Sequence, residues 1–143
     1  MEVETSSKEE TQKVAANLAK RLEGGDVIAL FGNLGAGKTT FVQGLAKAFG
    51  IGRRILSPTF VFIRSYEFSL KTKRLTFHHL DLYRCESRSD FEALGLEDIF
   101  ENDSITVIEW ADKIKEILPK KRIDVTFEIK NEYERLIRVN KHK

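Results

Sequence analysis

The chain has 143 residues, of which 41% are hydrophobic and 32% are charged, and this composition predicts one soluble globular domain over residues 1–143. The single cysteine excludes an internal disulfide framework, and no apolar run is long enough to cross a bilayer. The formal charge of +2 gives no argument for nucleic-acid binding by itself. Because the N-terminus is polar and acidic rather than signal-like, we expect a cytoplasmic protein.

The N-terminal part of the chain predicts a helix followed by a buried strand. Residues 1–6 are polar, and we expect them to be loosely ordered. Ser7 and Glu10 have the spacing of a capping box, and the apolar stripe that follows predicts a helix ending near Glu23, before two glycines. Residues 27–31 read VIALF, a short apolar run that is typical of a buried strand.

The next stretch, GNLGAGKT at residues 32–39, satisfies the phosphate-binding pattern G-x-x-x-x-G-K-[ST]. Apolar residues at helical spacing follow it, so we predict a second helix that ends at Gly50. The glycines allow backbone N–H groups to converge on phosphate oxygens, and the helix N-terminus adds a favourable field. The predicted polyphosphate site consists of Gly32, Gly35, Ala36, Gly37, Lys38, Thr39 and Thr40.

Three side chains of this loop have predicted roles. Lys38 would bridge the β- and γ-phosphate oxygens, and the Thr39 hydroxyl would take one position on an octahedral Mg²⁺. Thr40 could contact the α-phosphate.

The middle of the chain predicts an antiparallel pair of strands. Residues 59–63 begin a strand that could continue to Phe68, and residues 74–80 form a second strand after a polar turn. The connection is too short for a parallel crossover, so the pair should be antiparallel. Ser89 and Glu92 then have the spacing of another capping box, which predicts a short helix.

The C-terminal part predicts three more strands, over residues 105–108, 123–129 and 135–139, with a short helix over 112–118. The last two strands should form a hairpin. Together these elements predict an α/β protein with a three-layer P-loop NTPase fold, whose mixed, mainly parallel sheet contains an antiparallel hairpin.

Hydrolysis requires an acid that directs the metal and a group that positions water. Glu109 and Asp81 each follow an apolar strand, where such an acid belongs. We favour Glu109 for Mg²⁺, directly or through water, and Asp81 for orienting water or for the metal's outer sphere. Thr59 either senses the γ-phosphate or simply starts a strand after Pro58.

Three further side chains favour structural roles. His78 and His79 are neighbours on a strand and face opposite sides, so they cannot chelate one metal together. A role in packing or behind the metal ligands suits them better. Trp110 favours packing or an interface over a cofactor role.

Four segments, GNLGAGKTT, SPTF, HHLDLYR and IEW, resemble in order and spacing the bacterial TsaE (YjeE) family, and the resemblance extends from about Ser7 to Val139. It implies an ATPase that uses ATP and Mg²⁺ and works with the proteins TsaB and TsaD. Their product is threonylcarbamoyladenosine beside the anticodon of tRNA. The resemblance implies that TsaD is the transferase and that contact with tRNA is indirect.

The resemblance also implies roles for individual residues. It assigns Lys38 to phosphate, Thr39 to Mg²⁺, Glu109 to the metal-linked acid and Thr59 to a switch-like position. Asp81, Tyr83 and Arg84 match the H-x-D-x-Y-R segment, which the resemblance links to activity or partner docking. Ser7 and Arg135 are fainter matches, which the resemblance places near the nucleotide.

The residues alone leave three functions open. The first is an ATPase that is slow in isolation, because no arginine finger is evident. The second is a P-loop kinase for a small molecule, although 143 residues leave little room for an acceptor pocket and a lid. The third is a nucleotide-gated binding module with negligible turnover. A GTPase is disfavoured because the chain lacks the N-K-x-D guanine signature.

Overall fold

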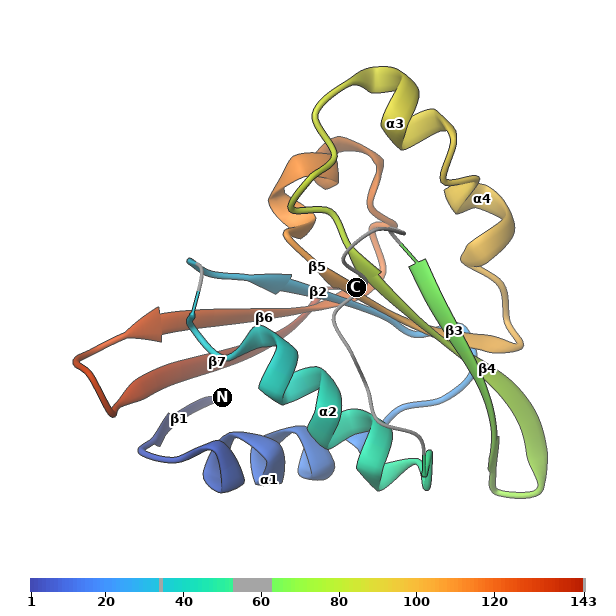
Figure 1. Cartoon of the computed structure of the whole chain (residues 1–143). Coiled ribbons are helices and arrows are strands. Elements are labelled where there is room, and N and C mark those ends of the chain that lie inside the picture. Colours follow the sequence, from blue (N-terminus) through green and yellow to red (C-terminus); the bar gives the residue numbers. More distant parts are fainter. Residues whose placement is uncertain (34, 53–62, 143) are drawn as a thin grey trace.

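The computed structural model describes residues 1–33, 35–52 and 63–142, and within them the chain forms one mixed sheet with helices on both faces (Figure 1). The order along the sheet is β1-β7-β6-β2-β5-β4-β3. The strands are β1 (Glu2–Thr5), β2 (Val27–Phe31), β3 (Ile63–Leu70), β4 (Lys73–Asp81), β5 (Ser104–Glu109), β6 (Arg122–Ile129) and β7 (Arg135–His142). The helices are α1 (Lys8–Ala19), α2 (Lys38–Ala48), α3 (Arg88–Glu92), α4 (Leu96–Ile99) and the 3₁₀ helix η1 (Ala111–Ile117).

The middle of the sheet is parallel, and both of its outer parts are antiparallel. Strand β2 lies between β6 and β5, and β4 follows β5, all in parallel register. The β3–β4 and β6–β7 hairpins and β1 complete the sheet with antiparallel pairs. The predicted three-layer α/β fold with an antiparallel hairpin is confirmed.

Two apolar layers cover the faces of the sheet. Along β2, Ile28 and Leu30 belong to the layer under α1 and α2, whereas Val27 and Ala29 belong to the layer under α4 and η1. Successive side chains of a strand point to opposite faces, so a strand covered on both sides needs an unbroken apolar run. The run VIALF meets this requirement and fixes β2 in the centre of the sheet.

Helices α1 and α2 pack closely where Gly44 faces the backbone of α1. A Cβ atom at Gly44 would lie 2.8 Å from both Cα and O of Gln12. We expect Gly44→Ala to lower the free energy of unfolding by about 1–2 kcal/mol, because overpacking outweighs the higher helix propensity of alanine. Urea denaturation would measure this change. Gly52→Ala is the control, since no residue that the structure describes lies within 4 Å of its Cβ position. Equal stability of the two variants would contradict the close packing.

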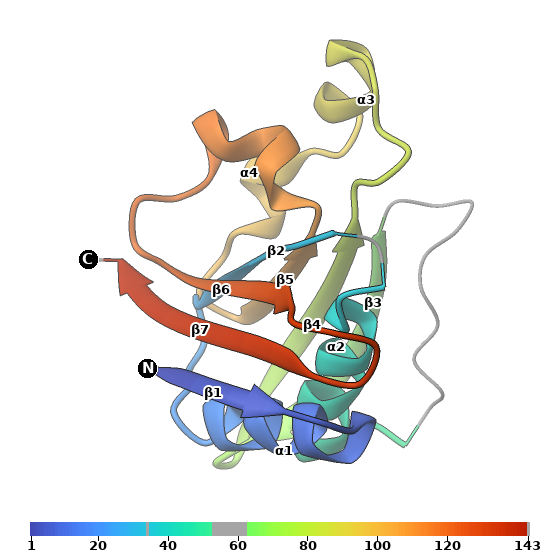
Figure 2. The same ribbon diagram turned by 90° about the vertical axis from the view of Figure 1, so that its left-hand side faces the viewer.

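The N-terminal segment is a strand, so the prediction that residues 1–6 are loosely ordered was wrong. Strand β1 pairs antiparallel with β7, from Glu2 opposite Arg138 to Thr5 opposite Arg135. Figure 2 shows β1 lying along the outer side of β7. At its start, the N-terminal amine of Met1 donates to the carbonyl of Val139 at 3.1 Å.

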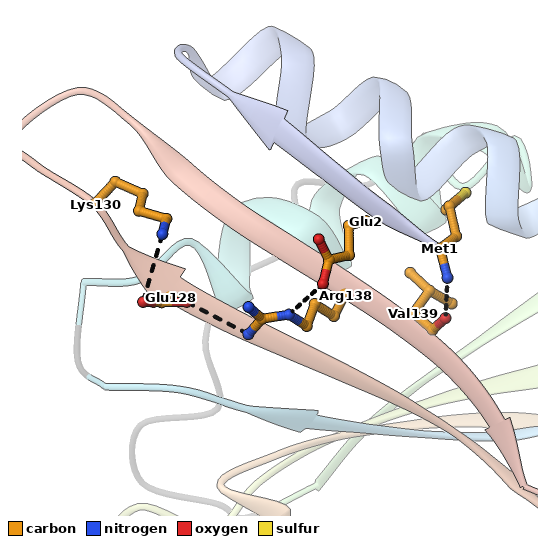
Figure 3. Close-up of polar contacts among 6 residues, drawn as sticks. All are labelled: Met1, Glu2, Glu128, Lys130, Arg138 and Val139. Carbon is orange, nitrogen blue, oxygen red and sulfur yellow. Dashed lines mark hydrogen bonds and ion pairs between the residues drawn. The ribbon is translucent and has the colours of Figure 1, made fainter.

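An arginine joins three strands at this end of the sheet (Figure 3). Arg138 on β7 lies 2.8 Å from Glu2 on β1 and 3.4 Å from Glu128 on β6. The hydrogen bond from Arg138 lowers the pKa of Glu2, so its contribution to stability is present at neutral pH and is lost as pH falls through the lowered pKa. The groups are exposed, and solvent keeps that contribution small.

Three predictions about helix ends and their capping were wrong in detail. Helix α1 ends at Ala19 rather than near Glu23, although Ser7 is its N-cap as predicted. The Glu10 carboxylate accepts from the backbone of Ser6 rather than Ser7, so the capping box is incomplete. The second capping box consists of Ser87 and Asp90, two residues before the predicted pair.

Candidate nucleotide-binding site

The glycine loop connects the end of β2 to the start of α2 and has a conformation that only glycines adopt readily. Gly35 and Gly37 have φ values of 80° and 103°. At Gly32, a Cβ atom would lie 2.9 Å from the carbonyl oxygen of Phe127 on β6. Gly37 is the N-cap of α2 and makes no side-chain capping bond, so the N–H groups of the first turn remain available to an anion.

Lys38 is buried at the start of α2, with only 4% of its surface exposed. Its Nζ donates to the carbonyl of Gly32 at 2.5 Å and lies 3.4 Å from the centre of the Trp110 ring. Burial lowers the pKa of Lys38, although the negative charges of Glu109, Asp112 and Asp81 partly oppose this effect. The ammonium therefore sits in a partly desolvated position, where its attraction to an anion is strengthened.

Glu109, at the end of β5, lies beside Thr39, the residue that follows Lys38 on α2. The Thr39 hydroxyl donates to its carboxylate, with distances of 3.0 and 3.2 Å to the two oxygens. Glu109 is only 3% exposed, and its Oε2 lies 2.5 Å from Nε2 of His79 on β4. The Thr39 hydroxyl and the Glu109 carboxylate are thus in direct contact, although 70 positions separate them in the sequence. Both are oxygen ligands of the kind that Mg²⁺ prefers.

Asp81 lies next to this acid. It ends β4 and is in register with Glu109 across the parallel β4–β5 pair, so both carboxylates emerge from the same edge of the sheet. The backbone N–H of Tyr83 donates to its Oδ1 at 3.1 Å. Asp81 and Glu109 thus lie at the ends of neighbouring strands. The division of roles between them remains a prediction.

A group of aromatic and basic side chains borders the two acids. The rings of Tyr83 and Trp110 lie 5.0 Å apart, and Nζ of Lys113 donates to the carbonyls of Tyr83 and Cys85. Trp110 has a left-handed backbone with φ of 59°. Burial raises the pKa of the Cys85 thiol, which lowers the fraction of reactive thiolate at neutral pH.

Arg135, at the start of β7, contacts the glycine loop. Its Nη2 donates to the carbonyl of Gly35 at 3.2 Å, and its Nη1 donates to the carbonyl of Asn131 at 2.9 Å. The family resemblance placed Arg135 near the nucleotide, but no local motif predicts this contact, because 100 positions separate the two residues. The guanidinium is therefore fixed beside the predicted phosphate loop.

The start of α1 also approaches the loop. Thr11 is buried, and its hydroxyl shares a hydrogen bond of 3.0 Å with the hydroxyl of Thr5. Its Cγ2 lies 3.9 Å from the position that a Cβ atom would take at Gly37. Ser7, the residue predicted near the nucleotide, uses its hydroxyl to cap this helix. Thr59 lies outside the described residues.

The structure separates the two neighbouring histidines as the strand pattern predicts. His79 is fully buried against Glu109, whereas Nδ1 of His78 lies 2.7 Å from the hydroxyl of Ser65 on β3. Trp110 was predicted to serve in packing or an interface, and its contact with Lys38 was not predicted. Its position directly after Glu109 was the available signal.

The described residues contain neither a preformed metal cluster nor a membrane-spanning helix. Within residues 1–33, 35–52 and 63–142, no three His, Cys, Asp or Glu side chains lie close enough together to hold a metal ion by themselves. A magnesium ion that binds together with a nucleotide takes several ligands from phosphates and water, so it does not require such a group. In the same ranges, no helix is long and apolar enough to cross a membrane.

The glycine loop between a central parallel strand and a helix, with an acid on the adjacent strand, defines a P-loop fold. The family model described as "Threonylcarbamoyl adenosine biosynthesis protein TsaE" matches residues 5–137. The chain belongs to this TsaE family, which confirms the resemblance seen in the sequence motifs.

Individual relatives agree with this membership. The chain is 40% identical to the tRNA threonylcarbamoyladenosine biosynthesis protein TsaE of Bacillus subtilis, over 93% of this chain and 80% of the relative. It is 35% identical to the TsaE protein of Treponema pallidum, over 86% of this chain and 87% of the relative. The crystal structure of YdiB from Bacillus subtilis matches with a TM-score of 0.81 at 32% identity, covering 99% of this chain and 84% of that one. A role in the biosynthesis of threonylcarbamoyladenosine in tRNA follows from these matches.

Proposed function

We propose that the chain is a magnesium-dependent ATPase that acts as an accessory subunit of a TsaB–TsaD complex in the cytoplasm. In this proposal the complex makes threonylcarbamoyladenosine next to the tRNA anticodon, and contact with tRNA is indirect. The observation that carries the ATPase assignment is the contact between the Thr39 hydroxyl and the Glu109 carboxylate at 3.0 Å. It joins the phosphate loop to an acid on the adjacent strand, which is the arrangement that metal-assisted phosphoryl transfer requires.

The residues present fit a nucleotide with its magnesium ion. Positive φ values at Gly35 and Gly37 turn the backbone toward the start of α2, where free N–H groups attract phosphate. Thr39 and Glu109 supply hard oxygen ligands, and Mg²⁺ would neutralise charge on the phosphate oxygens when bound. We assign Thr39 to the metal directly and Glu109 to it directly or through a water molecule.

Each remaining side chain has one task in this proposal. Lys38 leaves the carbonyl of Gly32 and donates to the β- and γ-phosphate oxygens, since a phosphate is the stronger acceptor. Asp81 accepts a hydrogen bond from the attacking water and orients it. Thr40 contacts the α-phosphate, and Arg135, which donates to the Gly35 carbonyl of the loop, borders the rest of the nucleotide. Ser7 keeps the place near the nucleotide that the family resemblance implies. Thr59 keeps the role of a γ-phosphate sensor that the family resemblance implies.

Partner proteins should accelerate ATP turnover. Across the described residues, the one arginine with a hydrogen bond to the glycine loop is Arg135, and it is already engaged with the carbonyls of Gly35 and Asn131. Supplying a missing cationic group to the transition state raises rates by about 10³–10⁵-fold in other P-loop enzymes. We therefore expect slow release of phosphate by the isolated chain and a clear increase when saturating TsaB and TsaD are added, measured by a phosphate-release assay. Equal rates with and without the partners would contradict the coupling.

The same preparations can separate the alternative functions. Transfer of the γ-phosphate to a sugar, nucleoside or amino acid, rather than to water, would favour a small-molecule kinase. Repeated cycles of tRNA modification with a non-hydrolysable ATP analogue would favour a binding module with negligible turnover. A pull-down with TsaB and TsaD, with and without ATP, tests the partnership itself.

A further inference from the structure

A buried histidine stands behind the acid of the proposed metal site. His79 on β4 has no exposed surface, and its Nε2 lies 2.5 Å from Oε2 of Glu109 on β5. The two strands are neighbours in parallel register, with His79 opposite Val107 and Asp81 opposite Glu109. His79 and Glu109 therefore lie on the same face of the sheet, and the carboxylate meets the imidazole at one oxygen and the Thr39 hydroxyl of α2 at the other.

The surroundings of the His79 imidazole favour one of its tautomers. Nε2 faces a carboxylate oxygen, which only accepts, so this nitrogen must carry hydrogen and donate. Within the described part of the chain, no partner lies within hydrogen-bond distance of Nδ1, which is buried. A hydrogen on Nδ1 would be a buried donor without an acceptor, which is costlier than a bare lone pair. The neutral Nε2–H tautomer satisfies both conditions.

This contact restricts the carboxylate of Glu109. Oε2 accepts from His79 at 2.5 Å and Oε1 from the Thr39 hydroxyl at 3.0 Å, so both oxygens are held and the carboxylate cannot rotate freely. Only the donor from Thr39 belongs to the loop that takes part in nucleotide binding. The donor from His79 belongs to strand β4 and not to the loop.

We infer that His79 is a positioning residue, which donates from Nε2 to Glu109 and holds this carboxylate in the orientation that magnesium binding requires. The inference rests on the proposed function, because Glu109 is assigned to the metal there. Hydrogen-bond partners behind metal ligands commonly contribute 10–100-fold to metal affinity or activity, roughly the effect expected here.

The test compares two substitutions of His79 with a control on the adjacent strand. His79→Leu fills the space but removes the donor, whereas His79→Gln places an amide N–H near the position of Nε2. Thr106→Val is the control, because Thr106 is buried on β5 and its hydroxyl has no partner in the described ranges. Calorimetry would measure the affinity for a non-hydrolysable ATP analogue in EDTA and in magnesium.

We expect His79→Leu to weaken the magnesium-dependent gain in affinity by about 10–100-fold while the affinity in EDTA is unchanged. His79→Gln should restore most of the gain, and Thr106→Val should match the unmodified chain. If His79 is purely structural, its replacement would lower thermal stability without changing the magnesium dependence. That result would overturn this inference but leave the proposed function in place. A failure of the unmodified chain to bind the analogue would instead remove the proposed function, and this inference with it.

The tautomer can be examined without any ligand. Long-range ¹⁵N–¹H correlation spectra of the unmodified chain, labelled at its three histidines, should show His79 with hydrogen on Nε2 and none on Nδ1. Hydrogen on Nδ1 alone would overturn the inference, because Nε2 could not then donate to Glu109. This measurement also decides the question if His79→Leu does not fold.

Discussion

Replacement of Lys38 by alanine is expected to lower ATP affinity by about 100-fold or more. The ammonium lies at the start of α2, where it donates to the Gly32 carbonyl and lies over the Trp110 ring. Two hydrogen bonds to charged phosphate oxygens would be lost in the complex, each with about 1.5–3 kcal/mol, and about 3 kcal/mol corresponds to roughly 100-fold. Calorimetric titration with ATP and magnesium would measure the affinity.

The matched control for this variant is Lys47→Ala, which removes an exposed lysine from the last turn of the same helix. It changes the net charge equally and should leave ATP affinity unchanged. Trp110, the one tryptophan of the sequence, provides a second readout, since withdrawal of Lys38 from its ring should alter its fluorescence. Equal affinities of Lys38→Ala and the unmodified chain would remove the phosphate loop from the proposed site.

Replacement of Glu109 by glutamine should lower ATP turnover by about 100-fold or more, while nucleotide binding in EDTA persists. Glutamine keeps the shape of the side chain but loses the charge that would attract the metal. It also places an amide where both neighbours, Thr39 and His79, donate to the carboxylate. Phosphate release as a function of magnesium concentration would measure the effect, with Glu116→Gln on the exposed face of η1 as the control.

Asp81→Asn distinguishes the roles of the two acids. If Asp81 orients water, its replacement should lower the maximal rate and leave the magnesium dependence near that of the unmodified chain. If Glu109 directs the metal, its replacement should shift the magnesium dependence itself. The reverse pattern would exchange the two assignments.

Local sequence patterns predicted the centre of the sheet correctly. The run at 27–31 and the glycine motif at 32–39 carry their own signals, since burial on both faces demands apolar residues and a phosphate loop demands glycines. Asp81 and Glu109 were predicted as candidate acids because each follows an apolar strand. Their adjacency in the structure follows from parallel pairing of β4 with β5.

Features that depend on distant partners were missed. Strand β1 has a polar sequence, and only its pairing with β7, more than 130 positions away, makes it a strand. The contact of Arg135 with Gly35 and that of His79 with Glu109 likewise depend on sheet register.

The second capping box was missed for a local reason. Ser87 and Asp90 have the same spacing as the predicted pair, and the Asp90 carboxylate also accepts from the N–H of Glu86.

The pairing of β1 with β7 has a consequence for folding. The first strand of the chain cannot be completed until the last strand has formed, so loop-closure entropy over almost the whole chain delays this edge. Thr5, at the end of β1, bonds Thr11, which packs beside Gly37. Pulse-labelled hydrogen exchange during refolding that protects β2 before β1 would therefore identify late assembly of the segment bordering the glycine loop, after the loop's own strand and helix are in place.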